Sequence, residues 1–187
     1  MKPRLPGKIG LVVLLYLASM LGYSASAQEA LATRLQIGIN LLPAIIAANN
    51  GLATIGNDEK LPIYLVYLDN DHVADLLKQS LGRVGQIRKH VIDIKIIKLD
   101  DLLALDPQPF STVFIAEALD SRLPDLIRFS RQQRALLFSP FKGDVKRGVA
   151  TGFRVTDQVL PLVNMESLKQ SKIQLKAFFL RIAVKHE

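Results

Sequence analysis

The sequence contains no cysteine, no tryptophan and only three histidines. Without cysteine the chain forms no disulfide and has no thiol chemistry, so the burial of apolar side chains must stabilise the fold. The histidines, His72, His90 and His186, are far apart and lack the spacing of metal ligands. We therefore expect no metal site.

Motifs that would identify a catalytic or cofactor site are also missing. The chain has no GxGxxG, no GxxxxGK followed by Ser or Thr, no GxSxG and no HExxH. No nucleophile can be paired with a base from the sequence, as a hydrolase would require. These absences predict that the protein is not an enzyme and that it needs no cofactor.

An export signal is predicted at the N-terminus. Three basic residues within the first eight precede an apolar run over residues 9–22, and an A-x-A site ends at Ala27. These three features in this order are typical of a secretory signal peptide. The alternative is a permanent membrane anchor, but the run is shorter than the roughly 20 residues of a spanning helix. We expect residues 1–27 to be removed before Gln28, which leaves residues 28–187 in the periplasm with no membrane span.

The mature region has the length of one domain and a mild positive charge. Its 160 residues can bury a sizeable core. Removing the basic residues of the signal leaves 21 basic and 17 acidic residues, a net charge of +4. This excess is spread along the chain, whereas a nucleic-acid binder concentrates its charge in a patch. We therefore expect no nucleic-acid partner.

Apolar patterning predicts an α/β domain. A helix over residues 29–42 is expected to end or kink at Pro43, and a bulge is expected at Ile96–Ile97. The expected strands are residues 61–68, 91–99, 112–116 and 135–138, and the helices between them begin near Asp71 and at Asp120 or Ser121. Such alternation favours parallel strands with helices on the faces. The sequence thus predicts a small three-layer sandwich around a mixed sheet of five to six strands.

The last third predicts a hairpin and two helices. Strands over residues 148–155 and 158–163 form the hairpin, and Pro161 places the second strand at a sheet edge because proline cannot donate to a ladder. Asn164 is a favourable N-cap for a helix over residues 165–170. An apolar stripe on a C-terminal helix either packs on the core or docks a partner, and it consists of Leu175, Phe178, Phe179 and Ile182.

Two loops carry the candidate contacts for a ligand or a partner. Asp69 and Asp71 follow the first strand, at the sheet edge where α/β proteins bind ligands. Alternatively, one of them caps the next helix. The loop over residues 139–148 could hold an anion or present a recognition surface, or it could be a charged connection with an aromatic side chain in the core. Its candidate residues are Phe141, Lys142, Asp144, Lys146 and Arg147.

The order of elements resembles the YfiR-like family of bacterial periplasmic regulators. The resemblance covers roughly residues 30–185 and is carried by the strands at residues 63–68 and 113–116, the run over residues 148–164 and the lysine-bearing last helix. It implies a periplasmic domain, often a homodimer, that restrains an inner-membrane signalling enzyme such as a diguanylate cyclase. The opening helix departs from the family, because Leu41-Leu42-Pro43 replaces its aromatic pattern.

Two functions therefore remain open. The first is a regulatory or adaptor protein that binds an inner-membrane signalling protein. The second is a periplasmic protein that binds or senses a small solute. The chain is short for a two-lobed solute-binding protein, which favours the first.

Overall fold

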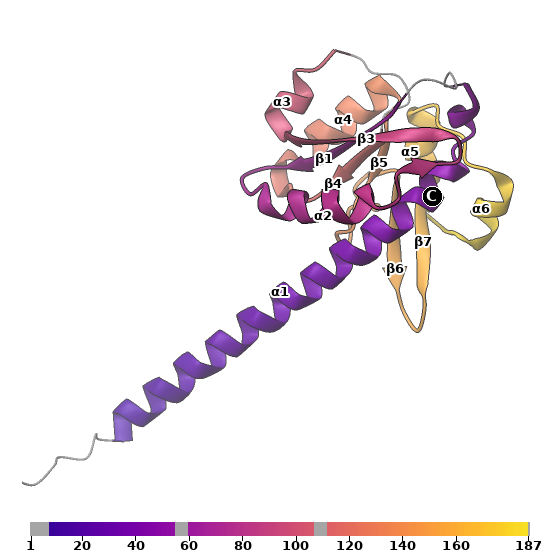
Figure 1. The fold of residues 1–187 in the computed structure, drawn as a ribbon. Helices are drawn as coiled ribbons and strands as arrows, with labels where there is room; N and C mark the ends of the chain where they lie inside the picture. The colour runs from indigo at the N-terminus through magenta and orange to yellow at the C-terminus, as the bar shows by residue number, and fades with distance from the viewer. Residues whose placement is uncertain (1–7, 55–59, 107–111, 187) are drawn as a thin grey trace, which may run out of the picture. The chain divides into compact units, whose positions relative to one another are not determined.

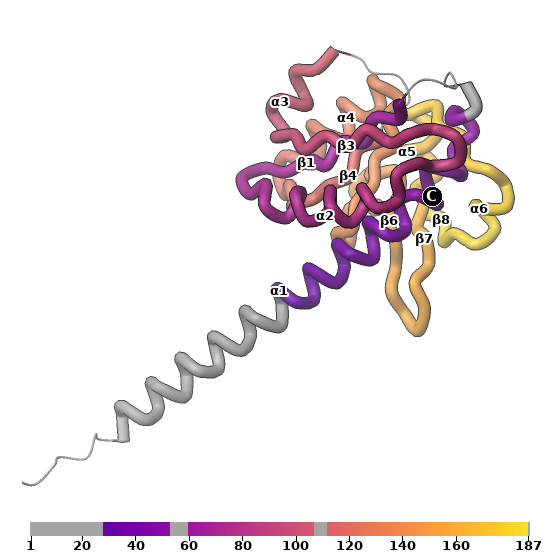
Figure 2. The backbone as a smooth tube through the Cα atoms, in the orientation of Figure 1, coloured from indigo at the N-terminus to yellow at the C-terminus, as the bar shows by residue number. Residues whose placement is uncertain are grey.

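The computed structural model describes residues 8–54, 60–106 and 112–186, and Figure 2 traces the backbone through them. The chain divides into two compact units, Met1–Arg34 and Leu35–Glu187. Helix α1 (Lys8–Ala48) begins in the first unit, so the apolar run of the predicted signal is helical. An apolar helix at this position is compatible with a signal sequence. The cations Lys2 and Arg4 lie outside the described residues.

The second unit is built on an eight-stranded mixed sheet with the order β2-β3-β1-β4-β5-β6-β7-β8. The strands are β1 (Leu61–Tyr67), β2 (Gln86–Ile87), β3 (His90–Lys98), β4 (Thr112–Ile115), β5 (Leu136–Phe138), β6 (Thr151–Val155), β7 (Val159–Asn164) and β8 (Val184–His186). Strands β3, β1, β4, β5 and β6 run parallel, and β7 turns back on β6 as a hairpin. The α/β class is confirmed. The predicted strand number was too low, because it omitted the short strands β2 and β8.

Helices cover both faces of this sheet. They are α2 (His72–Gly82), α3 (Leu99–Leu103), α4 (Leu123–Gln133), α5 (Met165–Gln170) and α6 (Ala177–Ile182), with 3₁₀ turns at Asn50–Thr54 and Asp120–Arg122. Figure 1 shows α2 on one side of the parallel strands and α3 and α4 on the other. Helix α2 lies in the connection from β1 to β3. The connections through α3 and α4 run in the opposite direction across the sheet, past β1 to β4 and then to β5. Right-handed crossovers in opposite directions place their helices on opposite faces.

The core joins the second unit's part of α1 to the middle of the sheet. The rings of Phe114 and Phe138 stack with centroids 5.2 Å apart, and Phe153 continues the stack at 6.4 Å. A Cβ on Gly38 of α1 would lie 3.1 Å from the Phe138 ring. The absence of a side chain at Gly38 therefore lets α1 pack closely on β4 and β5.

Two local predictions in this part of the fold differ from the structure. Helix α1 does not end at Pro43 but continues to Ala48, because Ile45 and Ile46 after the proline are buried in the core. The expected bulge in β3 was wrong. Strand β3 has no bulge, since its pairing with β1 runs unbroken from Ile92 to Lys98. Ile96 and Ile97 point to opposite faces and both pack partly against the core, so their adjacency needs no change of register.

The N-termini of α4 and α5, which follow β4 and β7, are capped differently. Helix α4 begins at Leu123 with no side-chain cap, so the expected cap by Asp120 or Ser121 was wrong; the 3₁₀ turn occupies these positions. The cap of α5 by Asn164 is confirmed, because its Oδ1 accepts from the Ser167 N–H at 2.8 Å. Strand β7 is flanked by β8 from Leu162 onward, so Pro161 lies just beyond the pairing rather than on a fully open edge.

The predicted C-terminal stripe is split between core and surface. Helix α6 spans only six residues, because the chain leaves it at Ala183 to form β8. Leu175 and Phe179 are buried in the core. Phe178 and Ile182 are 52% and 60% exposed, so half of the stripe remains available to a partner.

One described segment, Gln28–Ala48, is long and apolar enough to cross a membrane by length and composition. The buried helix of a soluble core and a signal sequence meet the same criterion. Leu35, Ile39 and Leu42 of this segment are buried inside the domain. The second half of the segment is therefore a core helix of the folded unit.

Candidate functional site

The carboxyl ends of the parallel strands bring both predicted loops to one edge of the sheet. Residues 68–71 follow β1, residues 116–122 follow β4, and residues 139–149 follow β5. The connection from β1 leads to β3 on one side, and the connection from β3 leads back past β1 to β4 on the other side. Ligands of open α/β sheets bind in the crevice at such a switch point. Both candidate loops therefore lie at the edge of the sheet where α/β proteins bind ligands.

At this switch point, the side chain of Glu117 binds the backbone of the loop after β1. Its Oε2 accepts hydrogen bonds from the backbone N–H groups of Leu68, Asp69 and Asn70, at 2.9, 2.9 and 3.0 Å. Burial alone would raise the pKa of Glu117, but the three N–H donors together hold it below its usual value. The loop after β1 thus has the geometry of an anion site, and the chain's own carboxylate occupies it.

Asp69 and Asp71 do not cap α2. Both side chains are exposed, and Asp71 at the N-cap position makes no side-chain cap bond. Asn70 between them accepts from the His72 N–H at 3.0 Å, which forms an Asx turn at the start of α2. The capping interpretation was therefore wrong in its residues, and the two carboxylates remain free to face solvent.

The second predicted loop is organised around a buried carboxylate. Asp144 is 6% exposed, and its Oδ2 accepts from the Ser139 hydroxyl at 2.6 Å. Arg147 lies 3.4 Å from its other oxygen and also donates to the Asp120 carbonyl in the loop after β4. Burial raises the pKa of Asp144, partly offset by the Ser139 hydrogen bond and the Arg147 charge. This network ties two loops of the same edge together.

The rest of the loop over residues 139–148 is held against the protein. Asn164 donates to the Val145 carbonyl at 2.8 Å, and the Ser167 hydroxyl donates to the Gly148 carbonyl at 2.7 Å. A Cβ on Gly152 would lie 2.7 Å from the Ser139 carbonyl oxygen, so the loop lies directly on β6. Phe141 packs partly against the core, whereas Lys142 and Lys146 are exposed. The loop is therefore a connection between strands that hydrogen bonds hold in place.

The candidate residues from the sequence lie at the carboxyl edge of the parallel strands, but they did not include Glu117. Glu117 follows a buried strand directly, as Asp69 does, and the rule that selected Asp69 would also have selected it. Among the described residues no group of three His, Cys, Asp or Glu side chains could hold a metal ion. None of the predicted contact residues lines the hollows at the β2–β3 turn or at the amino-terminal edge of the sheet.

Two adjoining hollows lie at the opposite, amino-terminal edge of the sheet. One has a volume of about 270 Å³ and the other about 530 Å³, and both are lined by Asn50, Lys172, Ile173 and Gln174. Arg134 lines the first, just before β5, and Lys169 of α5 lines the second. The two form one groove, which we call the 50–174 groove. Its residues were absent from the predicted set because they carry no motif.

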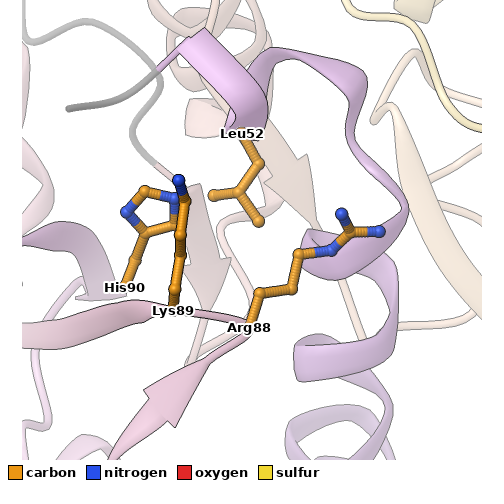
Figure 3. A pocket seen from close by; sticks show the side chains of 4 residues that line it. All are labelled: Leu52, Arg88, Lys89 and His90. Carbon is orange, nitrogen blue, oxygen red and sulfur yellow. The ribbon is translucent and has the colours of Figure 1, made fainter. Parts of the chain in front are cut away.

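A separate hollow of about 410 Å³ lies at the turn between β2 and β3 (Figure 3). Leu52, Arg88, Lys89 and His90 line it. His90 is 1% exposed, and its Nδ1 has no hydrogen-bond partner among the described residues. No group among the residues that the structure describes meets the hydrogen-bonding requirement of this nitrogen, and a buried polar atom left without a partner is costly.

Comparison with protein-family models and with curated proteins gives no match. The chain is similar to the crystal structure of a conserved domain protein from Vibrio cholerae O1 biovar El Tor strain N16961, with a TM-score of 0.55 and 13% sequence identity. The alignment covers 82% of this chain and 60% of that one, so the chain spans less than two thirds of that protein's length. At this identity the likeness concerns the fold alone, and it agrees with the α/β class.

Proposed function

We propose that the protein is a periplasmic regulator that binds and modulates an inner-membrane signalling enzyme, such as a diguanylate cyclase. The observation that supports it best is the exposure of Phe178 and Ile182 on α6. The two residues are four positions apart and share one face of the helix. Large apolar side chains gathered on a surface are typical of protein-binding sites.

Other features support the same proposal. The N-terminal apolar helix is compatible with export, and the α/β fold agrees with the YfiR-like resemblance. At the edge where an enzyme of this fold class would place its substrate, Glu117 and Asp144 are engaged with the chain itself. In this proposal the outer surface, rather than a substrate site at this edge, carries the function.

We expect Phe178→Ser combined with Ile182→Ser to reduce capture of the membrane partner by more than about tenfold. Removing buried anchor residues from an interface costs more than about 1 kcal/mol each, and 1.4 kcal/mol is a factor of ten. The measurement is crosslinking of the exported protein in cells, followed by mass spectrometry of the captured inner-membrane proteins. The captured protein should carry a signalling domain.

The matched control is Leu76→Ser combined with Val91→Ser. These side chains are 51% and 55% exposed but lie on α2 and β3, away from α6. They should leave capture unchanged. If wild-type protein captures no specific inner-membrane protein, or if both double variants capture it equally well, the proposal is wrong.

The hollow at His90 favours a second function, the binding of a small solute. Its volume lies within the range of small-molecule sites, and it combines the apolar side chain of Leu52 with the polar side chains of Arg88 and His90. A solute at 100 times its Kd should stabilise the protein by about 2.7 kcal/mol in a thermal-shift screen. Arg88→Gln, which alters the rim of the hollow, should abolish that shift. A screen of periplasmic metabolites with no shift would exclude this function.

A further inference from the structure

We propose that the 50–174 groove binds an acidic peptide segment with apolar side chains, contributed by the membrane partner. The proposal rests on the proposed function and names the chemistry of the partner's contact. It follows from the shape of the groove, from its charge and from its place beside α6.

The walls of the groove are fixed by backbone hydrogen bonds. The Asn50 N–H donates to the Gln174 carbonyl at 2.8 Å, and the Lys176 N–H donates to the Ala48 carbonyl at 2.9 Å. These bonds join the end of α1 to the segment before α6, and Asn49 forms a β-bridge with Leu175. The groove is therefore formed before a partner arrives, which lowers the entropic cost of binding.

The groove has cations at its rim and apolar side chains at its base. Arg134, Lys169 and Lys172 are exposed and form no ion pair with the described residues. No carboxylate is among the described residues that line it. Arg134 and Lys172 follow the ends of α4 and α5, where helix dipoles favour a positive charge without neutralising it. The apolar lining consists of Met165, Leu168, Ile173, Leu175 and Leu180.

This combination fits a peptide better than a single small anion. The cations are distributed over both hollows, and Lys172 lines the two in common, so one anion would contact only part of the set. A segment with acidic and apolar residues would pair with the rim and fill the base. Leu180 lines the groove from the same helix that exposes Phe178 and Ile182. One partner could therefore cover the groove and the apolar face of α6 together.

The test measures binding of a fluorescent twelve-residue peptide of alternating Glu and Leu to the purified exported protein by fluorescence polarisation. The wild-type protein should bind this peptide and should not bind the matching Gln-Leu peptide. Lys169→Glu combined with Lys172→Glu should weaken binding at least tenfold. The two lysines attract the glutamates of the peptide, whereas their replacements repel them. Added salt should weaken the wild-type interaction, since exposed charges are screened.

The control is Lys78→Glu combined with Lys98→Glu, an equal change of charge on exposed residues outside the groove. It should bind like the wild type. Equal binding by both double variants, no binding by the wild type, or binding only to phosphatidylglycerol vesicles would overturn the peptide assignment. If wild-type protein captures its membrane partner but the groove variant does so equally well, the groove proposal fails and the proposed function stands.

Discussion

Replacing Asn164 with alanine should lower the free energy of unfolding by about 2 kcal/mol. The side chain is 7% exposed and makes two hydrogen bonds of 2.8 Å, donating to the Val145 carbonyl and accepting from the Ser167 N–H. Loss of the cap costs about 1 kcal/mol. Loss of the second hydrogen bond costs about 1 kcal/mol more, because the Val145 carbonyl still accepts from the Gly148 N–H at 3.2 Å. The residue joins the end of β7, the start of α5 and the loop after β5, so these elements should loosen together.

Urea unfolding followed by circular dichroism would measure this loss. Asn164→Ser separates the two contributions, because its hydroxyl can still cap α5 but is too short to replace the amide donor. Its loss should be intermediate between those of the wild type and the alanine variant. Gln170→Ala, which removes only an exposed hydrogen bond to Glu166, should change stability by less than about 0.5 kcal/mol. A similar small change for Asn164→Ala would show that the loop after β5 is not held by this side chain.

The case of Asn164 also shows what the sequence predicts well. Asparagine before a short amphipathic run is a local signal, and the cap it predicts depends only on residues three positions away. The buried strands β1 and β4 were equally clear, because strands covered on both faces are apolar at nearly every position. Local patterns of this kind need no knowledge of distant contacts.

Features that depend on distant partners were missed. Strand β8 has only three residues and pairs because β7 has a free edge. The sequence of β8 alone does not indicate this pairing. Glu117 binds a loop 47 to 49 positions away, so its role could not be predicted from local sequence. Burial of Asp144 likewise depends on the way its loop lies on β6. The position of the candidate edge in the fold was therefore predictable, whereas the hydrogen bonds that Glu117 and Asp144 form within it were not.

Glu117→Ala should also destabilise the protein strongly, by about 2–3 kcal/mol at pH 7. Hydrogen bonds to a charged group contribute about 1.5–3 kcal/mol, and here one oxygen serves three N–H groups that water can reach in part. Glu117→Gln should cost less, because the amide oxygen can accept the same bonds without the charge. Glu166→Gln is the matched control on the exposed face of α5 and should have little effect.

The pH dependence distinguishes the Glu117 carboxylate from a simple packing contact. The pKa of Glu117 in the folded protein lies below its usual value of 4.5, so the unfolded chain takes up its proton first as the pH falls. The stabilisation is therefore fully present above that usual value and is lost as the pH drops through the folded pKa. The stability difference between wild type and Glu117→Gln should shrink accordingly in unfolding curves measured from pH 7 to pH 3. A difference that stays constant over this range would mean that the charge of Glu117 does not hold the two loops together.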